Sequence, residues 1–514
     1  MKKIILLICI VFAFSCNNDY LVTPSLTQVA EGNFWQSEED AYLALNGVYS
    51  QLQSRSMYGG CLNCWQGFPG FDNLGDNAFN QYKWEGPGVF MEGNYEPSGG
   101  QFRAVWNDHY QGIARVNAVI KNVKEISEDL IPAENKEALL GQAYFLRALM
   151  YFNLAVYWED VPLITEPQTL ETAYVAKNTY EEITEQIRED LTYSIGTLPE
   201  SYPANLYGYA TKGAALGLFA RVQLYNKQYD GPTGVLALTQ EAIGLGYSLH
   251  PDYAALFKPE NETSPEIVFS VRFLRGPDTN NGEIFSGTYG GSPKVDQRPM
   301  PNLVNDYYCT DGLPITESPL YNPSNKGLNR DPRAKGTIYF VGDQFFDNPV
   351  RNFTGNSPTG FGMRKYIRTG PDADGNGSAS EGSQDFYVIR YADILLMRAE
   401  AMAETGDVAG AMSMVNQVRA RVNMPSVESV EGAVGQQEMI DIVRHERRVE
   451  LALEGLRFMD LKRWGEIENA FSRAIADPVG PYNPQYLGPR SEVFPIPQDE
   501  IDVNPNLIQN PVWQ

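Results

Sequence analysis

The sequence is poor in histidine and cysteine, the residues on which most zinc and redox sites depend. Only three histidines occur among 514 residues. His445-Glu446 begins an H-E-x-x-H pattern, but Val449 stands where the second histidine would be. Cys61 and Cys64 form a lone C-x-x-C pair, without the second pair or the nearby histidines of a zinc site. This pair indicates a local disulfide or two free thiols, with a metal or redox site as the alternative.

Basic residues are also scarce relative to acids. The chain carries 40 Lys and Arg against 64 Asp and Glu, a formal charge of -24. Such a balance repels phosphates and excludes a nucleic-acid partner. A G-x-S-x-G elbow, a Walker loop and a G-x-G-x-x-G after a strand are all missing. A glycosidase needs only two carboxylates, which composition does not exclude, but the acids lie largely on expected helical faces, typical of solvated surface.

Long apolar runs are missing as well. The run Ile4–Phe14 is too short to span a bilayer, which needs about 20 apolar residues. It follows two lysines and precedes a small residue and Cys16, the pattern of a lipoprotein signal. We expect a signal peptide at 1–15, lipidation of Cys16, a tether at 16–28 and no other membrane anchor. A plain secretory signal with an incidental cysteine is the alternative.

Helical periodicity is present in three parts of the chain, at about 38–53, 106–245 and 390–464. Within them, small residues flank Gly/Asp turns in a rhythm that is typical of tetratricopeptide-like helix pairs, or of generic helical hairpins. The last helix is expected from about 437 to 464, with Glu446, Glu450 and Glu454 on one face.

Between about 251 and 389 the helical period disappears, and short runs such as Ile267–Phe273 and Thr337–Val341 indicate strands. The predicted fold is therefore mostly α, a tetratricopeptide-like scaffold that carries a loop-rich irregular insertion. Residues 29–514 are expected to form one domain.

Aromatic residues are abundant, with 30 Tyr, 24 Phe and 7 Trp, and many lie in loops rich in Gly, Asn and Pro. A neutral glycan offers apolar C–H faces to aromatic rings and hydroxyls to short polar side chains. The candidate ligand-binding residues are Trp65, Asp72, Tyr82, Trp84 and Tyr289. Core packing is the alternative for each ring alone, but a set of rings in one loop favours ligand contact.

One loop has the beginning of a calcium-binding pattern. Asp372, Asp374 and Asn376 follow the D-x-D-x-N-G order, in which alternating oxygens converge on one ion. Position twelve is Ser383 and not Glu, so a plain Asp/Gly turn is the alternative. No other cofactor is expected.

Four stretches, in order along nearly the whole chain, carry a family likeness. The first reads RALMYF, followed by DVPL, and the second reads RYADILLM, followed by AEA. The third reads ERRVEL, followed by EG, R and DLKRW, and the fourth reads PIP, followed by EI and NPNLIQNP. Their ranges are Phe145–Leu163, Arg390–Ala401, Glu446–Trp464 and Pro495–Pro511. Together they resemble the signatures of the SusD/RagB nutrient-uptake lipoproteins of Bacteroidetes, with Glu159 where that family usually has Gly.

The resemblance implies a non-enzymatic protein, lipid-anchored in the outer membrane and facing the cell surface. It would bind a neutral oligosaccharide or polysaccharide and deliver it to a SusC-like TonB-dependent porin. Arg447, Glu450 and Arg463 are expected to form ion pairs of the scaffold and not to contact ligand. A glycoside hydrolase on the same scaffold and a lipoprotein that binds only proteins or peptides are the alternatives.

Overall fold

The structure, a computed structural model, describes residues 34–60, 67–80, 88–275, 282–288, 297–345, 352–368, 381–480 and 482–514. Several predicted site residues lie outside these ranges: Cys16, Cys61, Cys64, Trp65, Tyr82, Trp84, Tyr289, Asp372, Asp374 and Asn376. The predictions that concern them stay predictions. Asp72 lies within the described ranges.

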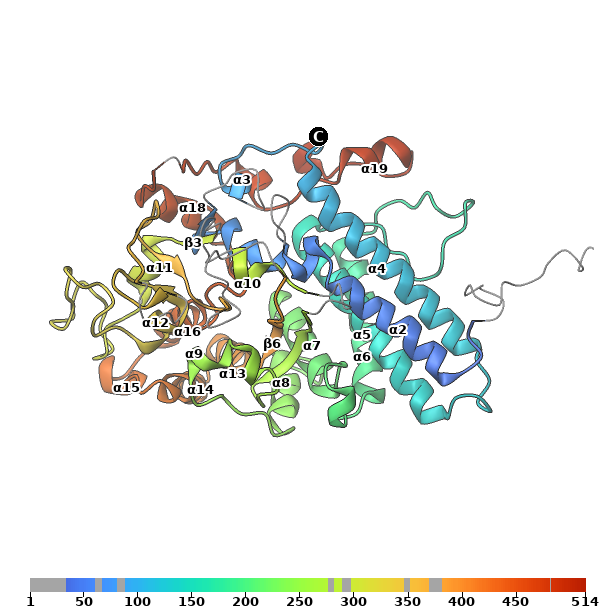
Figure 1. The fold of residues 1–514 in the computed structure, drawn as a ribbon, viewed down its shortest axis with the longest axis horizontal. Coiled ribbons are helices and arrows are strands. Elements are labelled where there is room, and N and C mark those ends of the chain that lie inside the picture. Colours follow the sequence, from blue (N-terminus) through green and yellow to red (C-terminus); the bar gives the residue numbers. More distant parts are fainter. Residues whose placement is uncertain are drawn as a thin grey trace, which may run out of the picture.

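A layer of paired helices forms the scaffold (Figure 1). The N-terminal helices pack in succession, α2 on α4, α4 on α5, α5 on α6, α6 on α7 and α7 on α8. Their bounds are α2 Glu38–Leu52, α4 Gly100–Glu125, α5 Ala133–Trp158, α6 Tyr180–Thr197, α7 Lys212–Tyr225 and α8 Val235–Ile243. The chain returns to this layer with α13 (Tyr391–Glu404), α14 (Val408–Arg421) and α16 (Gln436–Glu450), and α13 packs on both α8 and α16. The predicted mostly α class is confirmed.

Local signals explain where the helices begin. Thr179 and Glu182 form a capping box at the start of α6, in which each side chain binds the backbone of the other residue. Ser37 caps α2, and Asp407 caps α14 through the amide of Gly410. The predicted turn at Gly406-Asp407 therefore separates α13 and α14 as expected.

Among the described residues, one helix, α5, is long and apolar enough to span a membrane. Its most apolar window is 94% buried inside the protein, and its apolar residues join the main hydrophobic core. Such burial is typical of a core helix that other helices surround.

In the part of the chain that the structure describes, short elements and three two-stranded antiparallel sheets lie in the insertion or against it. The strands pair as β1 (Ala78–Asn80) with β3 (Gln297–Pro299), β2 (Ile267–Val271) with β6 (Phe386–Arg390), and β4 (Ile338–Tyr339) with β5 (Gly362–Met363). Strands β2 and β4 lie where the sequence predicted them. The short helices of this half are α3 Gly88–Met91, α9 Tyr253–Leu256, α10 Phe285–Thr288, α11 Pro301–Asp306, α12 Pro332–Thr337 and α15 Val427–Val430. Further short turns are η2 Arg55–Gly59, η3 Phe68–Leu74, η4 Ala204–Leu206, η5 Pro259–Asn261, η8 Gly488–Ser491 and η9 Pro511–Trp513.

The prediction of one continuous helix from about 437 to 464 is wrong. The helix α16 ends at Glu450, and α17 (Arg457–Trp464) begins after a six-residue break, followed by α18 (Ile467–Ala476) and later α19 (Gln498–Val503). Leu453 and Gly455 have φ angles of 64° and 78°, which end a right-handed helix. The break turns Glu454 toward two buried cations, Arg390 and Lys365.

The acids of this region do not form the solvated face expected for the acids in general, whereas the ion pairing implied by the resemblance for Glu450 is confirmed. Glu450 is fully buried and pairs with Arg390 at 2.7 Å, with Arg421 at 2.5 Å and with Arg333 at 3.1 Å. Burial alone would raise the pKa of Glu450, but Arg421, Arg390 and Arg333 hold that pKa well below its usual value. This cluster ties α12 of the insertion to α14, α16 and β6 of the scaffold.

The expected ion pairs of the signature residues are confirmed. Arg447 bonds Asp393 at 2.9 Å and Asp460 at 3.2 Å, and Arg463 bonds Asp460 at 2.7 Å. Arg463 also bonds Glu400 on α13. These side chains are buried, so the signature residues hold helices together and leave ligand contact to other residues.

Candidate functional site

The loops that carry the predicted aromatic residues are attached to neighbouring points of the structure. Strand β1 ends at Asn80, directly before residues 81–87, and strand β3 begins at Gln297, directly after residues 289–296. Asn80 and Gln297 are partners in the register of the β1–β3 sheet. The segment with Tyr82 and Trp84 therefore leaves the sheet beside the point where the segment with Tyr289 enters it.

The third aromatic segment, residues 61–66 with Trp65, begins next to the same part of the insertion. The amide of Ile284 donates a 2.8 Å hydrogen bond to the carbonyl of Gly59. Ile284 directly precedes α10, whose last residue Thr288 leads into residues 289–296. The segment 289–296 therefore follows a short helix that begins beside the first of these loops, and it ends beside the start of the second.

Asp72 lies in η3 and holds the scaffold together. Its carboxylate is fully buried, accepts a 2.7 Å hydrogen bond from Asn77, and accepts the backbone amides of Leu453 and Gly455. Burial raises the pKa of Asp72, and these hydrogen bonds act against that rise. In this arrangement Asp72 does not reach solvent, which corrects the expectation of a ligand contact.

Other polar and aromatic residues near the loops are also structural. Asp76 is buried and pairs with Arg457 at 2.7 Å, with Arg473 at 2.6 Å and with Arg448 at 3.3 Å. Tyr307, an aromatic residue of the same insertion, is fully buried and donates to the carbonyl of Val449. The sequence could not separate these residues from ligand contacts, because their partners lie far along the chain.

Two amide side chains beside the loops lack hydrogen-bond partners. Asn73 in η3 and Gln297 in β3 are at most 1% exposed, and neither the nitrogen nor the oxygen of either amide has a partner in the structure. Buried amides of native proteins almost always bond a protein group, water or a ligand. Both amides are enclosed by the protein, so, like Asp72, they do not reach solvent.

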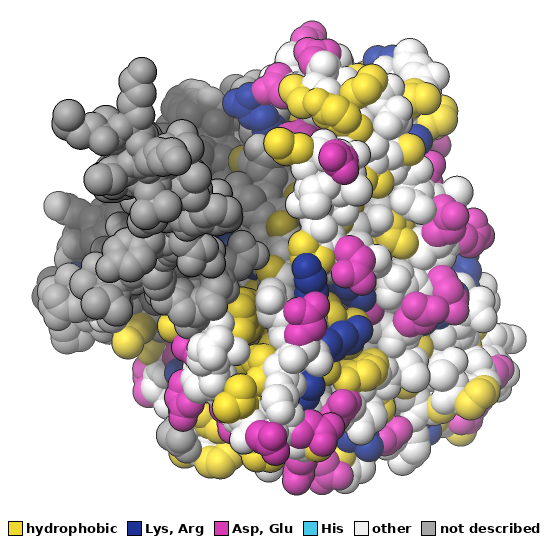
Figure 2. Space-filling model, turned by 90° about the vertical axis from the view of Figure 1, so that its right-hand side faces the viewer, with side chains coloured by type: hydrophobic (Ala, Val, Ile, Leu, Met, Phe, Trp, Pro, Cys, Tyr) yellow, Lys and Arg dark blue, Asp and Glu magenta, His cyan; other side chains and the backbone are white. Residues whose placement is uncertain are grey.

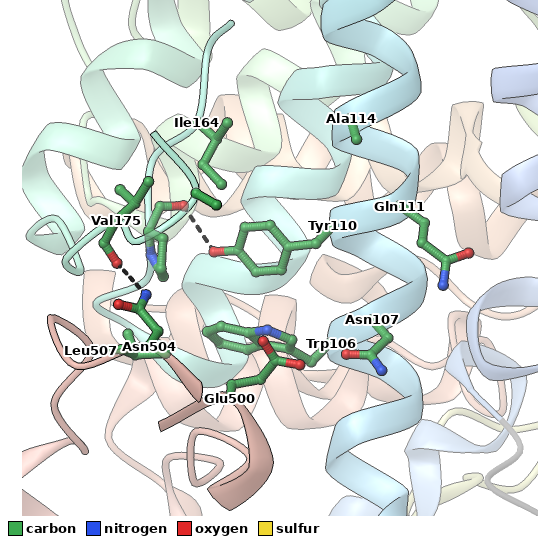
Figure 3. Close-up of a pocket in the computed structure, with 12 residues that line it drawn as sticks. Trp106, Asn107, Tyr110, Gln111, Ala114, Ile164, Val175, Glu500, Asn504 and Leu507 are labelled. Carbon is green, nitrogen blue, oxygen red and sulfur yellow. Dashed lines mark hydrogen bonds between the residues drawn. The ribbon is translucent and has the colours of Figure 1, made fainter. Parts of the chain in front are cut away.

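A separate pocket of about 430 Å³ opens between α4, the segment 162–175 and α19 (Figure 3). The rings of Trp106 and Tyr110, 4.8 Å apart, form one wall, and the Tyr110 hydroxyl donates to the carbonyl of Pro162 at 2.8 Å. Asn504 closes the opposite side by donating to the carbonyl of Val175 at 2.8 Å. The Glu500 carboxyl lies beside the Trp106 ring, and burial, followed by Asp499, raises its pKa.

The sequence shows helical periodicity from about residue 106 but gave no sign of this pocket. Glu500 and Asn504 come from the C-terminal segment, almost four hundred residues away. A pocket between such distant segments leaves no local pattern in a single sequence.

The rim of this pocket exposes apolar side chains. Leu170 is 94% exposed, and Tyr174, Val503 and Ile508 are each more than half exposed. Asn506 donates to the carbonyl of Tyr174, which joins the two segments of the rim. Figure 2 shows hydrophobic side chains gathered at the top of the right-hand face, the end at which α19 lies in Figure 1. These four residues are called the apolar rim below.

One pair of carboxyl groups has raised pKa values, which could suggest acid chemistry. Burial, then mutual repulsion, raises the pKa of Glu262 to about 8, and burial raises that of Asp385 to about 6. Asp385 is fully buried and accepts the amide of Phe273, while Glu262 accepts the amide of Asp385. These carboxyls therefore fix the junction of β2 and β6. Across the described ranges, no group of three or more His, Cys, Asp or Glu is placed to hold a metal ion.

Comparison with known proteins extends these observations. The SusD family model matches residues 265–513, and a model described as "Starch-binding associating with outer membrane" matches residues 66–224. SusD-like protein P25 of Formosa agariphila is 26% identical, covering 99% of this chain and 98% of the relative.

Solved structures agree over similar lengths. A SusD-like carbohydrate-binding protein from Bacteroides fragilis is 28% identical with a TM-score of 0.78, covering 92% of this chain and all of that one. A laminarin-binding SusD-like protein is 25% identical with a TM-score of 0.73, covering 93% and 99%. The chain belongs to the SusD family.

Proposed function

We propose that this protein binds a neutral oligosaccharide or polysaccharide without cleaving it and passes it to a TonB-dependent porin in the outer membrane. The observation that carries the proposal is that the segment with Tyr289 is connected at its two ends to the starts of the other two aromatic segments, through the pairings of Ile284 with Gly59 and of Gln297 with Asn80. Membership of the SusD family and the names of its relatives, one carbohydrate-binding and one laminarin-binding, support it.

The physical reason is the chemistry of the aromatic segments. Trp65, Tyr82, Trp84 and Tyr289 supply ring faces for the C–H surfaces of a sugar. Open sites with few contacts bind weakly, so we expect dissociation constants of about 1 µM to 1 mM. A neutral ligand also makes binding almost independent of salt.

Trp84→Ala is expected to weaken glycan binding about tenfold, because a stacked ring contributes roughly 1–2 kcal/mol. Isothermal titration calorimetry with maltoheptaose and laminarihexaose measures this on the soluble form, with Trp65→Ala and Tyr82→Ala beside it. Tyr321→Ala, a half-buried ring elsewhere in the insertion, is the matched control and should bind as wild type does.

Each result separates the alternatives. If the three loop variants bind normally while Tyr289→Ala does not, the site lies within the insertion. New reducing ends in the oligosaccharide would establish a hydrolase instead. If the wild-type protein binds no glycan on a broad array, the remaining alternative is a lipoprotein that binds only proteins or peptides.

For the porin, the apolar rim is the proposed contact surface. Exposed apolar patches of this kind are typical of protein interfaces, and a pocket with aromatic walls beside them suits a buried anchor side chain. The rim is also held in place by hydrogen bonds from Asn504 and Asn506 to the segment 174–175.

Leu170→Asp combined with Ile508→Asp is expected to reduce the porin recovered with the lipoprotein about tenfold or more, since two charges would be buried against the partner. Affinity purification after mild detergent extraction measures the recovery. Leu328→Asp is the control, because Leu328 is equally apolar and 44% exposed but lies in the insertion. Equal recovery with all variants would place the interface elsewhere.

A further inference from the structure

A second group of aromatic residues lines two adjoining pockets between α2, the segment 199–211 and β2. The pockets have volumes of about 230 Å³ and about 210 Å³, and both are lined by residues 207–209 and Ser270. Together they reach the range of ~300–1,000 Å³ that is usual for ligand sites. We call them the tyrosine groove, after the tyrosines that line it: Tyr49, Tyr202, Tyr207, Tyr209 and Tyr247.

Tyr209 lies at the centre of this groove. Its ring is 5.4 Å from that of Tyr49, 5.8 Å from that of Tyr202 and 5.9 Å from that of Tyr42. Its hydroxyl donates a 2.8 Å hydrogen bond to the side-chain oxygen of Asn46 on α2. The ring is thus held from several sides while remaining partly exposed, which is what a stacking platform requires.

Arg272 lines the pocket of about 230 Å³. Its guanidinium lies 4.7 Å from the centre of the Tyr207 ring and 3.3 Å from the Asp385 carboxylate. Gly208 allows this approach: its φ is 107°, and a Cβ there would lie 2.4 Å from Cδ of Arg272. The sequence Tyr207-Gly208-Tyr209 therefore places two rings in the groove, with the Arg272 side chain packed against Gly208 and over the Tyr207 ring.

The groove is polar but has no net charge. Among the residues that line it, Glu200 and Arg272 are the charged ones, and their charges balance. The Tyr202 hydroxyl is buried and has no hydrogen-bond partner in the structure. Ring faces together with hydroxyl, amide and guanidinium groups suit a ligand with apolar C–H faces and many hydroxyls.

We propose that the tyrosine groove is a second carbohydrate-binding site, which takes a short neutral stretch of the same polysaccharide as the aromatic loops. This inference rests on the proposed glycan-binding function and adds a second point of contact. The groove includes Gln53, and η2 (Arg55–Gly59) links that residue to the start of the segment that carries Trp65. Two modest sites on one protein hold a polymer more tightly than either site alone.

Affinity electrophoresis in gels that contain laminarin or starch tests the inference. Tyr209→Ala is expected to weaken retention about three- to tenfold, the factor for one stacked ring. The loss should add to that of Trp84→Ala, because separate sites contribute independently. Tyr209→Phe keeps the ring and should retain most of the binding. Asn46→Ala, at an exposed position, should weaken binding without threatening the fold.

Hydrogen exchange gives a second readout that does not depend on variants. Addition of laminarihexaose or maltoheptaose to wild type should slow exchange in the peptides that cover 199–212 and 263–272. Suppose that wild type binds a glycan through its loops, that these peptides do not change, and that Tyr209→Ala and Asn46→Ala are retained normally. The groove is then not a glycan-binding site, and the proposed function stays intact. If wild type binds no glycan at all, both are wrong.

Discussion

Arg390→Ala is expected to lower the free energy of unfolding by about 3–5 kcal/mol, because it leaves buried carboxylates without their partner. Arg390 is 1% exposed and donates to Glu454 at 2.7 Å, to Glu450 at 2.7 Å and to Glu266 at 2.8 Å. It also donates to the carbonyl of Glu450 at 2.8 Å. Loss of the Arg390 side chain would therefore weaken the contacts that β6 and the end of α16 make with each other and with the insertion.

Equilibrium unfolding in urea, followed by circular dichroism, measures the change. Arg103→Ala is the control: its partner is Asp499, and both side chains are about half exposed. An exposed pair contributes at most about 1 kcal/mol, so this variant should unfold almost as wild type does. Arg390→Lys keeps the charge but loses the planar fork, and an intermediate loss is expected. If Arg390→Ala costs no more than Arg103→Ala, the cluster does not stabilise the fold.

This cluster shows how far the sequence could predict the structure. Helices α6 and α13 lie within the parts of the chain that show helical periodicity, and α6 begins at a capping box, because such signals are local. The break between α16 and α17 has a distant cause. Residues 451–456 leave the helix so that Glu454 reaches Arg390 and the amides of Leu453 and Gly455 reach Asp72, about 380 residues earlier. No local pattern contains that information.

The same limit applies to the candidate site. The sequence indicated aromatic loops and the strand β2, but it did not pair β2 with β6 or β1 with β3, and this second pairing brings two of the loops to one place. Asp72 shows the opposite error, in which a structural residue is taken for a ligand contact. An aspartate in a Gly-rich loop looks the same in the sequence whether it binds a ligand or a buried backbone amide. The tyrosine groove was missed because its rings come from α2, from the segment before α7 and from the segment after α8, and none of these has a distinctive local pattern.

Cys16→Ala is expected to abolish incorporation of labelled palmitate and to release the protein from the membrane fraction. The apolar run Ile4–Phe14, followed by Ser15 and Cys16, is the pattern of a lipoprotein signal. Each buried CH₂ of an acyl chain contributes about 0.8 kcal/mol to membrane affinity, so loss of the chains removes the attachment almost completely. Among the described residues, the one helix apolar enough to span a bilayer is α5, which the protein core encloses.

Cys309→Ala is the matched control, because Cys309 is a buried free thiol and its removal should leave labelling and membrane attachment unchanged. Proteinase K added to intact cells tests the orientation: wild type should be digested if it faces the medium, as delivery of a large glycan to a porin requires. Unchanged lipidation of Cys16→Ala would remove the lipoprotein interpretation. A variant that loses its label but stays with the membrane would instead mean that the porin contact alone retains it, and the combination with Leu170→Asp and Ile508→Asp should then release it.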